Sequence, residues 1–196
     1  MALDYIIILM TNPVSWLIQI VIIAISTMAC RTVCPDIVSE IGIRRILLGY
    51  VAGLFGFVVY SLWISIDSIY LRISKGYLDA ASFYEGLPGS TLYTFLLLEF
   101  VAILILAILG LPVLLFLYHR KRASIAAFAG AAVVAALLIH GLFFAITSKN
   151  YWQRANIYEY YLTSLADIIL AFVIVAVAFS AGVGLPVLWG RRTHNV

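Results

Sequence analysis

The sequence predicts an all-α integral membrane protein with about five transmembrane helices, built from tandem parallel two-helix repeats. Three observations support this fold class. Of the 196 residues, 65% are hydrophobic and 11% are charged, whereas soluble domains average roughly 45–50% apolar and about 25% charged residues. The apolar residues form stretches long enough to cross a lipid bilayer as helices, and motifs of the first half return in the second half. Because no polar stretch is long enough for a soluble domain, we expect one membrane domain over residues 1–196.

Five apolar stretches reach the roughly 20 residues that a spanning helix needs. They cover residues 6–29, 46–71, 92–118, 123–147 and 162–189. Asn12-Pro13 interrupts the first stretch, so its helix is expected to begin near residue 14, behind an interfacial segment. A four-span arrangement, in which residues 1–29 lie partly on the membrane surface, remains an alternative.

An internal duplication relates the two halves of the chain. The pentapeptide Gly-Leu-Pro-Val-Leu at 110–114 returns at 184–188, an offset of 74 residues. Further upstream the offset becomes 77, where Ala52-Gly53 matches Ala129-Gly130. We therefore divide the chain into a half-unit (1–45), repeat one (46–122) and repeat two (123–196). Each repeat holds two spans, so both copies have the same orientation and their axis lies along the membrane normal.

The distribution of Lys and Arg predicts how the chain is oriented. Eight basic residues lie on one side of the predicted spans and four on the other. The first set is Arg31, Arg44, Arg45, Arg120, Lys121, Arg122, Arg191 and Arg192, and the second is Arg72, Lys75, Lys149 and Arg154. The richer side should be cytoplasmic, which places the C-terminus in the cytoplasm and, with five spans, the N-terminus outside. We expect a cytoplasmic-type membrane, that is, an inner or plasma membrane.

Three prolines are candidate kinks. Pro112 and Pro186 follow Gly110 and Gly184 in the duplicated pentapeptide, and Pro35 stands ten residues before Arg45, as Pro112 does before Arg122. A proline removes one backbone N–H and clashes with the carbonyl four residues back, so each should bend or end its helix near the cytoplasmic face. A packing kink is the simpler interpretation, and a hinge or gate is the alternative.

Small residues mark candidate helix-packing or oligomer faces. Residues 46–71 contain Gly49, Gly53 and Gly56, and residues 123–147 contain Gly130 among many alanines. Small residues four apart let helix backbones approach closely in lipid. We expect these two equivalent helices to lie at the centre, packed against each other or against another subunit, and we expect a homo-oligomer.

The predicted outer loops repeat Ser-Lys-x-Tyr and Tyr-Glu at the offset of 74. Aromatic belts at the headgroup level are ordinary, but a belt does not require a repeated register, so an external partner is the alternative interpretation. On the cytoplasmic side, the loop 30–45 is the expected site for a cytoplasmic partner. The candidate outer-loop binding residues are Lys75, Tyr77, Tyr84, Glu85, Lys149, Tyr151, Tyr158 and Glu159.

Four ionisable residues fall within the predicted spans, namely Asp67, Glu99, His140 and Asp167. Each costs roughly 2.5–3.5 kcal/mol on insertion scales, so such residues form a candidate intramembrane polar site. Glu99 and His140 are each seven residues from their predicted outer borders, and the short link 119–122 predicts that their helices are antiparallel neighbours. We expect the pair to meet as a hydrogen-bonded lock, with proton or ion handling as the alternative.

No catalytic motif accompanies these residues. The chain has no His-Glu-x-x-His, Gly-x-Ser-x-Gly or Walker glycine loop, and we expect no enzyme, no cofactor, no metal and no direct nucleic-acid partner. The predicted function is therefore that of a non-enzymatic subunit that works by protein–protein assembly in the bilayer: a scaffold, a sensor or an accessory component of a membrane complex, for example in defence or immunity. The alternative is an oligomeric ion channel or small transporter that uses Glu99 and His140.

The charge distribution gives a direct test of topology. A reporter fused after Val196 should read as cytoplasmic, and a reporter inserted at Gly86 should read as external, because the basic links favour the cytoplasm. Matched alkaline phosphatase and fluorescent-protein fusions measure both positions. A cytoplasmic signal from position 86 would contradict the parallel arrangement of the repeats.

Overall fold

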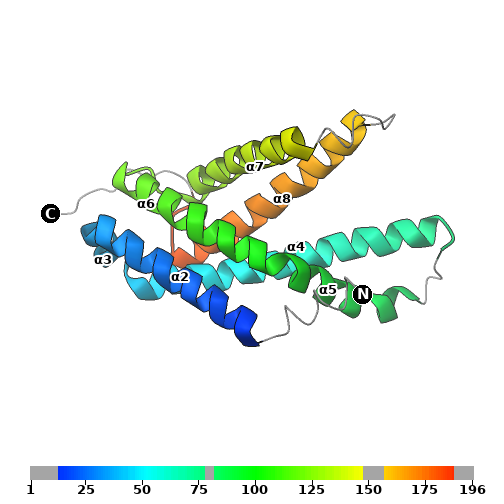
Figure 1. The fold of residues 1–196 in the computed structure, drawn as a ribbon, viewed down its shortest axis with the longest axis horizontal. Helices are drawn as coiled ribbons and strands as arrows, with labels where there is room; N and C mark the ends of the chain where they lie inside the picture. The colour runs from blue at the N-terminus through cyan, green and yellow to red at the C-terminus, as the bar shows by residue number, and fades with distance from the viewer. Residues whose placement is uncertain (1–12, 78–81, 148–156, 188–196) are drawn as a thin grey trace.

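The computed structural model describes residues 13–77, 82–147 and 157–187, and these residues are helical apart from short links. In chain order the elements are α2 (Pro13–Val33), α3 (Pro35–Ile41), α4 (Ile43–Ser74), α5 (Ser82–Ile105), the π-helical η1 (Leu106–Gly110), α6 (Leu111–His119), α7 (Ile125–Thr147) and α8 (Ile157–Val183) (Figure 1). The all-α class is confirmed for the described part of the chain.

Within the described residues, four helical stretches are long and apolar enough to cross a membrane: α4, Ala102–His119, Ile125–Leu142 of α7 and Ser164–Val183 of α8. Leu17–Val33 of α2 and Pro35–Ile41 (α3) pass the same test as a pair, and they are bent by 119° at the break between them. The expected four to five spanning helices are therefore confirmed by length and composition. The break in the N-terminal region of the described chain lies at Cys34-Pro35, whereas Pro13 begins α2 and the preceding residues lie outside the description.

The closest helix packing in the described chain joins α4 to α8. Gly49 and Gly56 of α4 face Val183 and Ala178 of α8 so closely that a Cβ on either glycine would lie within 2.7 Å of those side chains. From the other side, a Cβ on Gly182 would lie 2.6 Å from the carbonyl oxygen of Leu48. The two backbones are therefore in contact, which only glycine permits at these positions.

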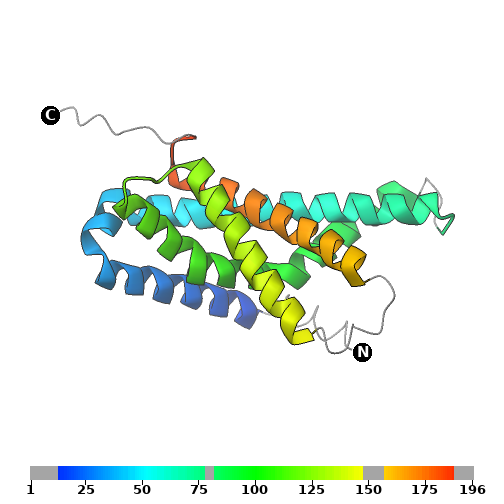
Figure 2. The same cartoon turned by 90° about the horizontal axis from the view of Figure 1, so that it is seen from above.

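This arrangement differs from the packing expected from sequence. Of the two packings expected for helices 46–71 and 123–147, against each other or against another subunit, the first is not found within the chain: α4 packs on α8, and α7 also packs on α8 (Figure 2). The reason is complementarity: α8 presents Ala178 and Gly182, four residues apart, to the glycines of α4. Gly130 of α7 faces no such surface, since a Cβ there would have no neighbouring atom within 4 Å.

The first copy of Gly-Leu-Pro continues its helix through a π-helical turn. Pro112 cannot donate a hydrogen bond, and the N–H of Leu111 reaches back five residues to the carbonyl of Leu106. In the same π register the residue that would donate to the carbonyl of Ala107 is Pro112, which has no N–H. The hydroxyl of Ser26 in α2 takes its place and donates to the Ala107 carbonyl at 2.6 Å. Local π geometry and a serine from a neighbouring helix thus compensate for the proline, as membrane helices allow.

The second copy of Gly-Leu-Pro ends its helix. Gly184 has φ +85°, and the N–H groups of Gly184 and Leu185 donate to the carbonyls of Ala181 and Ser180, which is the Schellman termination. The carbonyl of Pro186 then accepts a hydrogen bond from the N–H of Ile125 at 2.8 Å. The segment after α8 therefore caps the first turn of α7, where N–H groups lack partners within the helix.

The candidate partner loop 30–45 is largely helical and folded onto the protein. Val38 and Ile41 of α3 are buried in the main apolar cluster, and α3 contacts α2, α4 and α6. Its charged residues Asp36 and Glu40 are exposed. The apolar face of this short helix is therefore used inside the molecule, and only its polar face remains accessible.

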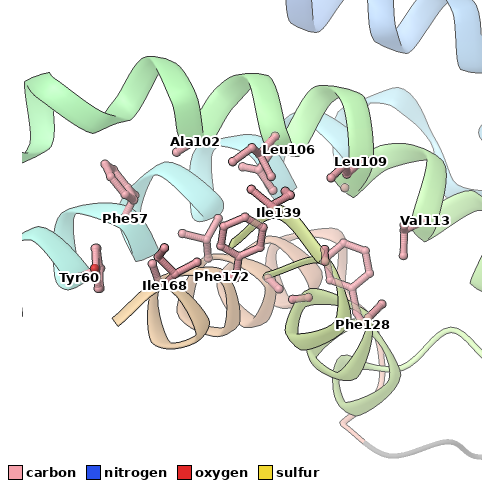
Figure 3. A pocket seen from close by; sticks show the side chains of 18 of the residues that line it. Phe57, Tyr60, Ala102, Leu106, Leu109, Val113, Phe128, Ile139, Ile168 and Phe172 are labelled. Carbon is pink, nitrogen blue, oxygen red and sulfur yellow. The ribbon is translucent and has the colours of Figure 1, made fainter. Parts of the chain in front are cut away.

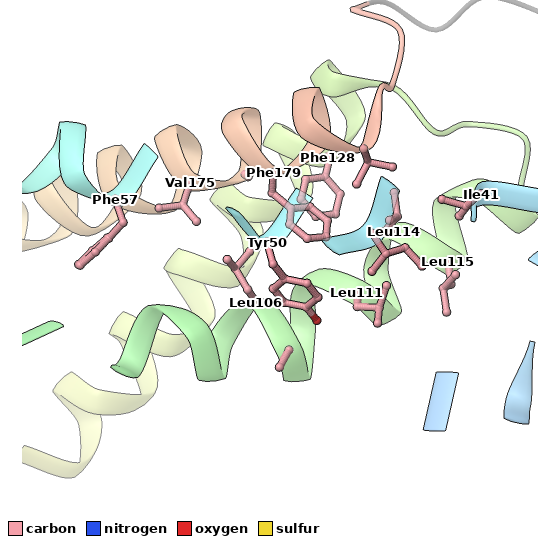
Figure 4. Packing of buried hydrophobic residues seen from close by; sticks show 14 of the residues in the cluster. Ile41, Tyr50, Phe57, Leu106, Leu111, Leu114, Leu115, Phe128, Val175 and Phe179 are labelled. Atoms are coloured by element: carbon pink, nitrogen blue, oxygen red, sulfur yellow. The ribbon is translucent and has the colours of Figure 1, made fainter. Parts of the chain in front are cut away.

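The two helical hairpins separate with distance from the α4–α8 crossing. Figure 1 shows α4 with α5 and α7 with α8 as two pairs that diverge toward one end of the molecule. We call the other end, which carries the α3–α4 and α6–α7 links, the basic end, because Arg44, Arg45 and residues 120–122 lie there. The side chains of the core cluster, among them Tyr50, Leu106, Leu114 and Phe179, gather toward the basic end (Figure 4).

The α4–α8 contact can be tested with two glycine substitutions. Gly182→Ala places a Cβ against Leu48, Gly49 and Ala52, and overpacking of this kind costs about 1–3 kcal/mol. Gly130→Ala is the matched control, because it meets open space and adds helix propensity of up to about 1 kcal/mol. Thermal unfolding in detergent should show a lower Tm for Gly182→Ala and an equal or higher Tm for Gly130→Ala. Equal Tm values for both variants would contradict the contact.

Candidate functional site

A cavity of about 480 Å³ lies between the two hairpins. Its walls come from α4, the continuous helix α5–η1–α6, α7 and α8 (Figure 3). Tyr60 and Ile168 lie toward one end of the cavity, and Val113 and Phe128 lie toward the basic end (Figure 3). The cavity is therefore elongated along the helices, and it is the main candidate site in the described structure.

The cavity exists because α7 contacts the helix before it only near their shared link. The tight link 120–124 begins with a second Schellman termination, in which Lys121 has φ +55° and Arg122 donates to the carbonyl of Leu117. Beyond this link α7 packs on α8, while α5 packs on α4. Small side chains of α7 widen the space that remains, since Ala131, Ala132 and Ala135 face it.

Two polar side chains are found among the described residues that line the cavity, Tyr60 and His140. The imidazole of His140 is only 4% exposed, and its Nε2 lies 3.3 Å from the hydroxyl of Ser164 on α8. Ser164 stands one helical turn beyond Ile168, so this contact marks the end of the cavity that is far from the basic end. Tyr60 is likewise buried, at 7% exposure. The site is apolar over most of its length and polar at one end.

The pair of Glu99 and His140 remains a prediction. Glu99 lies in α5, and its side chain is outside the described part of the chain. The helices 92–118 and 123–147 contact each other through α6 and α7, beside their short link, while α5 packs mainly on α4 and α7 mainly on α8. The partner that the structure gives to His140 is Ser164, a residue that the sequence analysis did not single out.

The two aspartates do not line this cavity. Asp67 is exposed on α4, and Asp167 is half-buried on α8. In lipid a carboxylate is costly unless it is paired or reaches water. Both residues lie in the halves of their helices away from the basic end.

The candidate outer-loop residues are only partly described. Lys75 caps the end of α4 and is exposed, as is Tyr77. Tyr84 and Glu85 lie in α5, and Tyr158 and Glu159 lie in α8, but their side chains are outside the description, and Lys149 and Tyr151 fall in an undescribed segment. The structure therefore brings no described pair of these residues together, and their role remains a prediction.

A second hollow of about 380 Å³ lies between α2 and α6, near the basic end. Cys30, Cys34 and His119 contribute to its wall, and both cysteines are free thiols. Across the residues that the structure describes, no group of three His, Cys, Asp or Glu side chains is placed to hold a metal ion. This hollow is lined mainly by apolar groups such as Pro112 and Leu115.

The sequence analysis identified His140 but missed the cavity around it. The sequence predicts that the alanines of α7 pack against another helix, whereas in the structure three of them line the cavity. A signal was present in their spacing, since Ala131, Ala135 and Ile139 recur every four residues on one helical face. Nothing in the sequence, however, indicated that no helix would pack against this face of α7.

Comparison with known protein families, with curated proteins and with solved structures finds no match to this chain.

Proposed function

We propose that this protein is a non-enzymatic membrane component that works by assembly, as a scaffold, sensor or accessory subunit in a cytoplasmic-type membrane. In this proposal five spans place the C-terminus in the cytoplasm and the N-terminus outside, following the distribution of basic residues. The tandem repeats supply equivalent helices, and the outer loops and the polar face of α3 remain candidate surfaces for further partners.

The observation that carries this proposal is the open face of α7. Only 17% of its span is buried within the molecule, against 44% for α4. Ala126, Gly130, Val134 and Leu137 form an exposed stripe along it, and the first two have the spacing of a small-residue packing motif. The equivalent face of α4, around Gly53, is fully used against α8 and Leu106.

A second copy of the same chain is the proposed occupant of this face. The duplicated sequence gives α7 the small-residue face that α4 uses for close packing, and within one chain α7 leaves it open. Two copies related by a two-fold axis can bury this face against itself, which is the commonest form of homo-oligomer. The alanine and glycine side chains on this face favour contact with another helix over contact with lipid, because the two helix backbones can approach closely there.

Replacement of Gly130 by leucine tests this contact. Gly130→Leu should lower the mass of the protein in detergent toward the 21.7 kDa of one chain, because the larger side chain separates the helices. The fold should persist, since the position is open within one chain. Val51→Leu, at a position of α4 that is 64% exposed, is the control. Multi-angle light scattering measures the mass, and an unchanged mass for Gly130→Leu would overturn the proposed face.

The alternative function is an oligomeric channel or small transporter. The burial of His140 in a candidate span favours it, because intramembrane ionisable groups mark ion and proton pathways. Gly53→Leu is not a useful probe of either function, since the new side chain would meet Leu106 and Phe179 inside the molecule.

Liposomes that contain the purified protein separate the two functions. If assembly is the function, proton and cation flux should equal that of protein-free liposomes. If the protein conducts, flux should appear, and Glu99→Gln should reduce it while leaving the oligomeric mass unchanged, because the amide keeps the hydrogen bonding but cannot carry a proton. Flux that is present and insensitive to Glu99→Gln would exclude a role for Glu99 in conduction.

A further inference from the structure

The elongated cavity between the hairpins is not used by the proposed assembly face, which lies elsewhere on α7. We propose that this cavity binds an uncharged single-chain amphiphile: one long hydrocarbon chain that carries one hydrogen-bonding group, a hydroxyl or a carbonyl. The chain lies along η1 and α7 toward the basic end, and the polar group lies at the Tyr60 and His140 end.

The length of the cavity matches a hydrocarbon chain. Its lining on the α5–η1–α6 helix extends from Ala102 to Val113, which is about 16 Å at the helical rise of 1.5 Å per residue. One leaflet of the hydrocarbon core is about 15 Å thick, half of the roughly 30 Å of the whole core. A chain of ordinary membrane length therefore fills the cavity from end to end.

The volume of the cavity, about 480 Å³, is sufficient for a hydrocarbon chain that runs along its length of about 16 Å. A hydrocarbon chain about 4 Å across, the contact distance between carbon atoms, takes roughly 200 Å³ over the same length. The cavity accommodates one chain with room for bends or methyl branches, and it lies within the range of about 300–1,000 Å³ typical of small-ligand sites.

The lining determines the polarity of the ligand. Between Ala102 and Val113 on one wall and Phe128 and Ala135 on the other, the described side chains are apolar. No Asp, Glu, Lys or Arg is found among the described residues that line the cavity, so a phosphate or carboxylate would lack a counter-charge in a low-dielectric site. A neutral polar group is compatible with the phenol of Tyr60 and the imidazole of His140.

The polar end distinguishes specific binding from filling by bulk lipid. Any acyl chain of the bilayer gains dispersion contacts in an apolar hollow. A ligand with a hydroxyl or carbonyl at the correct end gains in addition a hydrogen bond to a buried side chain, which is worth about 1 kcal/mol, or roughly five-fold in affinity. The contact of His140 with Ser164 holds the imidazole in position at this end.

Photolabelling of the full chain in detergent micelles tests the proposal. The probe is a sixteen-carbon alcohol with a diazirine near the middle of its chain, and labelled peptides are identified by mass spectrometry. We expect saturable labelling of η1 and α7 near Leu106 and Ala132. Unlabelled hexadecanol should compete at least five-fold better than hexadecane, which lacks the polar group, and dipalmitoyl phosphatidylglycerol should not compete.

Three variants connect the labelling to the cavity. Ala132→Trp should abolish saturable labelling by filling the space, whereas Val51→Trp, at an exposed position of α4 outside the cavity, should leave it unchanged. Tyr60→Phe removes only the hydroxyl and should weaken competition by hexadecanol about five-fold. If Ala132→Trp does not fold, Tyr60→Phe and the labelled positions in the unmodified chain still decide the result.

Several outcomes would overturn the proposal. Labelling that does not saturate, or that falls equally on the exposed surface of α4 near Val51, would show filling by bulk lipid only. Equal competition by hexadecane and hexadecanol would show that the site does not recognise a polar group. Unchanged competition by hexadecanol in the Tyr60→Phe variant would show the same. Competition by the phospholipid at least as strong as by hexadecanol would show a charged headgroup and exclude a neutral ligand. None of these outcomes depends on the oligomeric state, so the assembly proposal stands or falls separately.

Discussion

The close crossing of α4 and α8 is the contact on which the rest of the bundle depends. At Gly49, Gly56 and Gly182 the two backbones touch, and side-chain packing of this density is the main source of helix association where there is no hydrophobic effect between helices. One further helix packs on each of these two helices: α5 packs on α4, and α7 packs on α8. The α4–α8 crossing lies nearer the basic end. The two hairpins are therefore close together at that end and separate toward the other end, and the cavity lies where they begin to separate.

The duplicated Gly-Leu-Pro shows how one local sequence acquires two structures. In the first copy Gly110 is helical, and the chain continues through η1 because Ser26 of α2 satisfies the carbonyl of Ala107. In the second copy Gly184 takes φ +85° and ends α8, and the freed segment caps α7 through Pro186. The difference lies in the neighbours: the first copy has a helix beside it that supplies a hydroxyl, and the second lies beside the first turn of α7, where it accepts the N–H of Ile125.

These two outcomes shape the candidate site. The π-helical turn places Leu106, Leu109 and Gly110 along one wall of the cavity, and the capping of α7 by the segment after α8 fixes where the opposite wall begins. A straight α-helix through Pro112 would present a different set of side chains, because one inserted residue rotates all that follow by about 100°. π-helical turns often mark functional sites, and here the turn lines the cavity between the two hairpins.

The sequence by itself determined the all-α class and the four to five helices that are long and apolar enough to span a bilayer, because in lipid every backbone polar group must be satisfied within the helix and about 20 apolar residues are needed to span it. It also identified the glycines at 49, 53 and 56 as a packing face and His140 as an unusual intramembrane group. Only the tertiary structure decided that this face meets Ala178 and Gly182 of α8 rather than α7, and that His140 meets Ser164. Helix pairing depends on which two helix surfaces fit each other. The residue spacing within one helix does not show which distant helix has the matching surface. The cavity follows from the same choice, since it is the space left where α7 has turned toward α8.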